Sequence, residues 1–123
     1  MKTRMLGAME VSEIGFGTMS FASMYGASPE EAEAIGVIRG AFDVDVTHFD
    51  TAEAYGPWTN EVLVGKALAP IRDKVTIATK FGWNIDQTTG ARGPGLNSRP
   101  EQIRKVAENS LKRLGIETID LFY

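Results

Sequence analysis

Three titratable side chains stand where β-type runs of the sequence give way to loops that contain glycine. Asp50 closes the run Val46–Asp50, Tyr55 follows in the next loop, and Lys80 closes the run Val75–Lys80. A carboxylate, a phenol and an ammonium group can together perform proton-transfer chemistry. Each of the three taken alone is at least as well explained as a loop cap, a surface aromatic or a solvated strand end. Taken together, they predict a proton-transfer site that the remaining chain must position.

The composition argues against several other kinds of site. The chain has 123 residues, a net charge of −3, no cysteine and one histidine. These counts exclude disulfides, thiolate chemistry and a multi-histidine metal centre, so we expect no metal. Charges are scattered, and no window approaches the roughly 20 apolar residues of a membrane span, so we expect neither nucleic acid nor membrane as partner and a cytoplasmic location. We interpret the lone His48 as a hydrogen-bonded interior residue.

Short apolar runs predict the strands. A polar–apolar alternation over Met5–Val11, with Gly7 and Ala8 at the turn, predicts a small β-hairpin at the start of the chain. Four strands are then expected over Ile14–Thr18, Val46–Asp50, Val75–Lys80 and Thr118–Tyr123. Because side chains alternate between faces, one inner face collects Val46, His48, Asp50, Thr76, Ala78, Lys80, Ile119, Leu121 and Tyr123.

The first helix has a strong start signal. Ser28, Pro29 and Glu31 form a capping-box pattern, and Asp43–Asp45 closes the helix. Residues at helical spacing then predict its buried face, which consists of Ala32, Ile35, Ile38 and Phe42.

Two further helices follow the second and third strands. The second is capped by Thr59 or Asn60 and stops near Pro70, whereas the third is capped by Ser98 and ends at Gly115. Their expected apolar faces are Val62, Leu63, Ala67 and Leu68 in the second, and Ile103, Val106, Ala107, Ser110, Leu111 and Leu114 in the third. The intervening segment 81–97 contains four glycines and a proline. Its length predicts a functional or disordered loop.

Strands and helices therefore alternate, which predicts an α/β fold with a parallel sheet and right-handed crossovers. A dinucleotide-binding Rossmann motif would place G-x-G-x-x-G after the first strand, but Gly15–Ser20 lacks the third glycine. The titratable groups instead follow the carboxyl ends of several strands, where (β/α)-barrel enzymes place their active sites. The pattern thus favours a parallel (β/α) barrel.

At this point several segments resemble signatures of the aldo-keto reductase superfamily. They are Phe49–Gly56, Ile77–Gly82 and Asn97–Glu101, with support from Gly15–Met19 and Ser110–Gly115. The resemblance spans the whole chain in the order and spacing of the family's N-terminal part. It implies one domain over residues 1–123, with four strands and three helices of a TIM-type (β/α)8 barrel preceded by the hairpin.

The resemblance also implies an activity. The family reduces aldehydes or ketones to alcohols with NADPH, and the matching proton donor is Tyr55, whose phenol has a free pKa of about 10. Lys80 matches the cation that lowers this pKa, and Asp50 matches the carboxylate that orients the cation. Gly17, Thr18, Met19 and Asp50 match positions beside the cofactor. Tyr25, Trp58 and Trp83 lie in loops, where they could stack on the nicotinamide or line a pocket for a small carbonyl substrate, with structural packing an equal alternative for each.

The chain also departs from the family pattern. A complete barrel needs at least about 200 residues, and the family's catalytic His lies two positions beyond Tyr123. The main phosphate site of the family is built from later strands. We therefore expect the chain alone to be weakly active or inactive, and to self-associate or pair with a complementary C-terminal fragment through its open edge strands. The alternative is a non-catalytic half-barrel that acts as an assembly or binding module.

Overall fold

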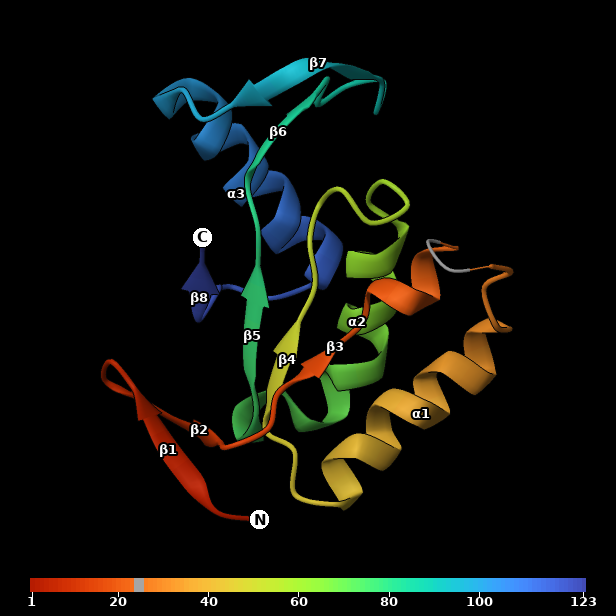
Figure 1. The fold of residues 1–123 in the computed structure, drawn as a ribbon, viewed down its shortest axis with the longest axis vertical. Helices are drawn as coiled ribbons and strands as arrows, with labels where there is room; N and C mark the ends of the chain where they lie inside the picture. The colour runs from red at the N-terminus through yellow and green to blue at the C-terminus, as the bar shows by residue number, and fades with distance from the viewer. Residues whose placement is uncertain (24–25) are drawn as a thin grey trace.

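A computed structural model describes residues 1–23 and 26–123 of the chain, and Figure 1 shows its arrangement. Its strands are β1 (Thr3–Leu6), β2 (Met9–Ser12), β3 (Phe16–Gly17), β4 (His48–Asp50), β5 (Thr76–Thr79), β6 (Gly82–Ile85), β7 (Arg92–Asn97) and β8 (Leu121–Phe122). Its helices are α1 (Glu31–Asp43), α2 (Thr59–Leu68) and α3 (Pro100–Leu114), with 3-10 turns η1 (Met19–Ala22) and η2 (Ala69–Lys74).

The central sheet is parallel and has the order β3-β4-β5-β8. Gly17 pairs with Asp50, Asp50 with Ala78, and Ala78 with Leu121, so the carboxyl ends of neighbouring strands lie together at one end of the sheet. The three α-helices cover one face of this sheet, and the β1–β2 hairpin lies at the opposite end from β6 and β7 (Figure 1). This arrangement of successive parallel strands with outer helices confirms the predicted barrel-type α/β fold and the N-terminal hairpin.

The core lies between the sheet and the helices. Phe49 and Ile77, on neighbouring strands, point to this side and are fully buried. They pack with residues from all three helices, which include Ile38, Val64, Leu68 and Leu114. The opposite, inner face holds the other set of alternating side chains, and there His48 Nδ1 lies 2.8 Å from Thr76 Oγ1. The predicted faces of Phe49 and Ile77 are thus confirmed, and His48 is a half-buried, hydrogen-bonded residue of the inner face.

Helix α2 lies directly against the backbone at the end of α3 at Gly65. A Cβ atom at this position would overlap the backbone carbonyl of Leu114. We expect Gly65→Ala to lower the free energy of unfolding by about 1–3 kcal/mol, because overpacking against backbone outweighs the helix propensity of alanine. Urea denaturation measures the change. Gly36→Ala on α1, where an added Cβ meets nothing within 4 Å, is the matched control and should stabilise by up to about 1 kcal/mol. Equal effects of both variants would contradict the close approach.

The predicted N-caps of all three helices are wrong, and in α2 the N-cap residue is Trp58, with no side-chain cap. Helix α1 begins at Glu31, because the Ser28 hydroxyl is bound elsewhere: it donates to the Phe21 carbonyl at 3.0 Å and lies 2.6 Å from Ser23 Oγ. Helix α3 has Arg99 at its N-cap and no side-chain cap, and its first residue is Pro100, a favoured first helical residue. Ser28 is therefore held by a loop contact instead of capping α1, and Ser98 lies one residue before the N-cap of α3.

The segment 81–97 is not the predicted long loop. It forms the antiparallel hairpin of β6 and β7, with Gly82 opposite Asn97 and Ile85 opposite Arg92. Asp86 closes the turn by accepting the backbone N–H groups of Thr88 and Thr89, each at 2.8 Å, and these bonds hold the pKa of Asp86 below its usual value. The glycines and proline that obscured the strand pattern are accommodated in β7.

Three side chains lie on other faces than predicted. Ala32 of α1 and Val62 of α2 are exposed, whereas Ala34 and Val64 are buried, since each helix is rotated towards its neighbours. Val46 lies in the helix-side core rather than on the inner face, because the regular strand begins only at His48.

Neither a membrane-spanning helix nor a metal-binding cluster is found among the described residues. None of their helices has both the length and the apolar character needed to cross a membrane. They also contain no cluster of three or more His, Cys, Asp or Glu side chains that could hold a metal ion.

Candidate active site

Asp50, Tyr55 and Lys80 come together at the carboxyl end of the sheet. Asp50 ends β4, and Lys80 directly follows β5, so adjacent strands place their side chains side by side. The Lys80 ammonium donates to Asp50 Oδ1, to the Thr51 carbonyl at 2.7 Å and to Tyr55 Oη at 3.3 Å. An ammonium has three donors, so all of its N–H groups are used.

Lys80 keeps its charge in this setting. Its partial burial lowers the pKa, but the hydrogen bond and charge of Asp50, together with Tyr55, outweigh burial and raise the pKa above its ordinary value. Since a raised pKa keeps an amine protonated, Lys80 is a cation at neutral pH. Its Nζ also lies 5.0 Å from the centre of the Tyr55 ring.

The loop that carries Tyr55 is held by backbone contacts. Thr51, Ala52 and Ala54 are buried, the Tyr55 N–H donates to the Ala52 carbonyl at 3.2 Å, and Arg92 donates from β7 to the Ala54 carbonyl at 2.5 Å. The β6–β7 hairpin therefore braces the loop, a role that the sequence pattern did not predict.

Glu53 is a buried carboxyl beneath this loop that the sequence analysis did not single out. Its Oε2 accepts Gln87 Nε2 at 2.9 Å, whereas Oε1 has no partner among the described residues. Burial raises the pKa of Glu53, against the opposing effects of Gln87 and Arg113. Its position inside the Phe49–Gly56 segment was the available signal.

Tyr123 also belongs to the cluster. Its hydroxyl donates to Asp50 Oδ2 at 2.7 Å, and its ring centre lies 5.3 Å from Lys80 Nζ. The strand alternation already placed Tyr123 on the inner face beside Asp50 and Lys80, so that pattern was the signal for its proximity.

Comparison with known proteins identifies the family. The model described as the aldo/keto reductase family matches residues 13–123. The chain belongs to this family. It is 44 % identical over 115 residues to probable aldo-keto reductase 1 of Glycine max, and this match covers 93 % of this chain and 32 % of the relative. This aldo/keto reductase chain thus spans about a third of the length of the curated relative it matches.

Solved aldo-keto reductases have the same fold. The holo form of one from Bacillus halodurans superposes with a TM-score of 0.81 at 33 % identity, over 99 % of this chain and 39 % of that structure. One from Klebsiella pneumoniae in complex with NADPH has a TM-score of 0.73 at 25 % identity, over 92 % of this chain and 34 % of that structure. The resemblance noted in the sequence is thereby confirmed.

The positions expected beside the cofactor differ in what they expose. Gly17 is open: it pairs with Asp50, and an added Cβ would meet nothing within 4 Å. Thr18 is buried, and its hydroxyl contacts Asn60 Oδ1 at 2.6 Å. Met19 is half-buried at the start of η1. In this aldo/keto reductase chain, therefore, the surface beside Gly17 and Asp50 is open, whereas the Thr18 side chain holds the loop through its contact with Asn60.

The expected substrate residues have different surroundings. Trp83 shares a cavity of about 390 Å³ with Lys80 and Tyr123, and the Arg92 guanidinium lies 5.6 Å from its ring centre. Tyr25 falls outside the described residues. Trp58 packs 5.4 Å from the Arg113 guanidinium, and its buried indole N–H has no partner among the described residues.

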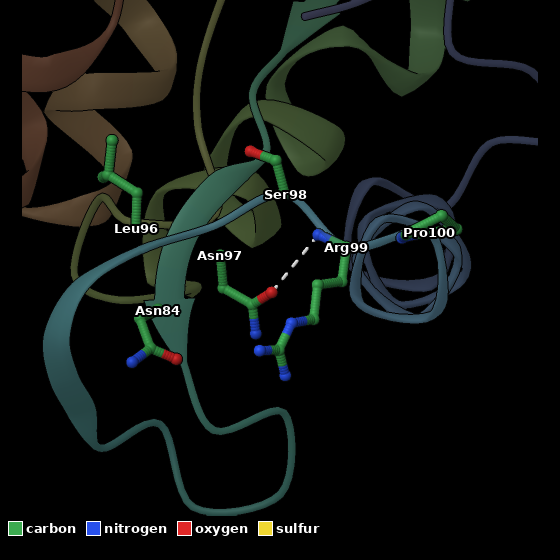
Figure 2. A pocket seen from close by; sticks show the side chains of 6 residues that line it. All are labelled: Asn84, Leu96, Asn97, Ser98, Arg99 and Pro100. Atoms are coloured by element: carbon green, nitrogen blue, oxygen red, sulfur yellow. Dashed lines mark hydrogen bonds between the residues drawn. The ribbon is translucent and has the colours of Figure 1, made fainter.

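A neighbouring hollow of about 490 Å³ lies where the hairpin meets α3. Figure 2 shows it, with the Asn97 side-chain oxygen accepting the Arg99 backbone N–H at 3.2 Å. It shares Leu96 and Ser98 with the Trp83 cavity. The carboxyl end of the sheet therefore carries an open surface that continues from Lys80 towards α3.

Proposed function

We propose that this chain supplies the proton-donating centre of an NADPH-dependent aldo-keto reductase that reduces aldehydes or ketones to alcohols, with Tyr55 as donor and Lys80 and Asp50 as its assistants. The observation that carries the proposal is the 3.3 Å contact from Lys80 Nζ to Tyr55 Oη. Because an ammonium can only donate, Tyr55 is the acceptor in this contact, and its own O–H is left to donate to a substrate oxygen. A cation at this place stabilises the phenolate that proton transfer leaves behind.

The open surface at Gly17 and Asp50 fits the nicotinamide end of the cofactor. When bound, NADPH supplies the hydride that is added to the carbonyl carbon. Support comes from the Klebsiella pneumoniae relative, which is in complex with NADPH. Backbone groups of Gly17 and Met19, together with Asp50, would hold the nicotinamide end, and Trp83 would line the substrate side of the cavity.

The phosphate groups of the cofactor fit this centre less well than the nicotinamide does. Phosphates bind to free cationic or N–H groups, but all three N–H groups of Lys80 are already donated to Asp50, Thr51 and Tyr55. We therefore propose that residues beyond this chain hold the phosphates, and that the chain alone is weakly active or inactive.

A chimera tests the proposed function. This chain would replace the matching segment of the Glycine max relative, which supplies the rest of the length. With NADPH and a reactive aldehyde, we expect the nicotinamide absorbance to fall at a rate that depends on Tyr55, and the chain alone to show little or no such loss. Fluorescence titration with NADPH separates cofactor binding from turnover. A chimera that binds NADPH but does not reduce the aldehyde would contradict the proposal.

The open sheet edges favour association. Among the described strands, β3 and β8 each have a partner on one side only, and unpaired edges invite pairing with another chain. We expect sedimentation velocity to show species larger than one chain, or a shift to a defined complex when a complementary C-terminal fragment is added. A compact monomer that melts cooperatively would contradict this expectation. Association without any turnover by the chimera would favour the alternative, a non-catalytic assembly or binding module.

A further inference from the structure

We propose that Tyr123 is a positioning residue of this site, whose hydroxyl holds Asp50 Oδ2 so that Oδ1 stays directed at Lys80. The inference rests on the proposed function for its kinetic consequence, and on geometry for the contact itself. Tyr123 Oη lies 2.7 Å from Asp50 Oδ2, while Lys80 binds the other oxygen. A carboxylate can only accept, so the phenol is the donor.

The donor count explains why this second oxygen matters. Lys80 divides its three N–H groups among Asp50 Oδ1, the Thr51 carbonyl and Tyr55 Oη. If Asp50 Oδ2 lost its partner, the carboxylate could turn and take a second N–H group from Lys80. The Tyr55 contact, which at 3.3 Å is longer than the Thr51 contact at 2.7 Å, would be the one given up. Tyr123 thereby keeps the third N–H group aimed at the proton donor.

Tyr123 is itself held in place. Its N–H donates to the Thr79 carbonyl at 3.3 Å, and its carbonyl accepts the Phe81 N–H at 2.9 Å, on either side of Lys80 in the next strand. Burial and the negative Asp50 raise the pKa of Tyr123, while Lys80 opposes them. The phenol therefore remains protonated, and a hydrogen-bond donor, at neutral pH.

A titration of Tyr123 tests the contact in the full chain. The sequence has three tyrosines, so the variant Tyr25→Phe/Tyr55→Phe leaves Tyr123 as the one phenol, and its ionisation is read from the ultraviolet absorbance against pH. We expect a midpoint above the free value of about 10. Adding Asp50→Asn should lower this midpoint, because the negative acceptor is lost, and adding Lys80→Met should raise it, because a cation is lost.

Shifts in opposite directions cannot arise from unfolding, which would bring every variant to the free value. An unchanged midpoint in both Asp50→Asn and Lys80→Met would overturn the proposal. In the turnover assay, Tyr123→Phe should lower kcat about 3–10-fold with KM little changed, and a kcat equal to that of the parent protein would also overturn it. If both titration shifts occur but no Tyr55-dependent turnover is found, the proposed reaction fails while the Tyr123–Asp50 contact is supported.

Discussion

Tyr55→Phe is expected to lower kcat/KM for NADPH-dependent reduction of an aldehyde by about 100- to 10,000-fold, the usual contribution of a positioned general acid. The substitution removes only the hydroxyl that receives the Lys80 contact at 3.3 Å, and the ring can remain in place. Without this proton, the developing alkoxide must be protonated by water. The loss of nicotinamide absorbance, measured in the chimera under saturating NADPH, gives the ratio of rates.

Lys80→Met should cause a loss of similar order, since it removes the cation that binds both Asp50 and Tyr55. Lys66→Met is the matched control, because the Lys66 ammonium binds Glu31 on the surface, at 2.9 Å, away from the site. A Tyr55→Phe protein that binds NADPH and retains the parent rate would exclude Tyr55 as the donor. A large loss in Lys66→Met would instead indicate a general loss of folded protein.

Arg113→Met is expected to lower the free energy of unfolding by about 3–5 kcal/mol, the usual cost of leaving a buried charge without its partner. Glu61 is fully buried; its Oε2 receives Arg113 Nε at 2.5 Å, and its Oε1 receives the Thr79 hydroxyl at 2.6 Å. Removal of the guanidinium therefore leaves a carboxylate in the core between α2, α3 and β5. Urea denaturation at neutral pH measures the loss.

The double variant Arg113→Met/Glu61→Gln separates the charge from the packing. Gln removes the buried charge and keeps an oxygen for the Thr79 hydroxyl, so most of the lost stability should return. Lys66→Met, which breaks an exposed ion pair, should change stability by no more than about 1 kcal/mol. If the double variant were as unstable as Arg113→Met, then the guanidinium would act through packing against Trp58 rather than through its charge.

Much of the fold follows from local sequence signals. The alternation of apolar runs and helical spacing predicted the parallel strands, and the period of two placed Asp50 and Lys80 on one face, as the structure shows. These signals succeed because strand and helix periodicity depend on neighbouring residues, each of which must direct its apolar side chains to the same core. Gly115 likewise ends α3 in the left-handed conformation that glycine favours.

Where a sequence pattern fits two different structures, only the tertiary structure decides between them. Ser28 carries a capping pattern, yet its hydroxyl donates to the Phe21 carbonyl, a contact made by the folding of the preceding loop. The segment 81–97 reads as loop because glycine and proline weaken its local pattern, but its two halves pair with each other as β6 and β7. Pairing depends on what lies opposite a strand, which no local pattern contains.

The same distinction applies to the candidate site. By itself the sequence determined the kinds of side chain at the strand ends, the face that they share and the family to which their motifs belong. Only the tertiary structure decided the partners of each polar atom: Asp50 receives Lys80 from 30 residues away and Tyr123 from 73 residues away. Such contacts depend on the order of strands in the sheet and on the donors and acceptors that each group has left, and both are settled only when the distant segments pack together.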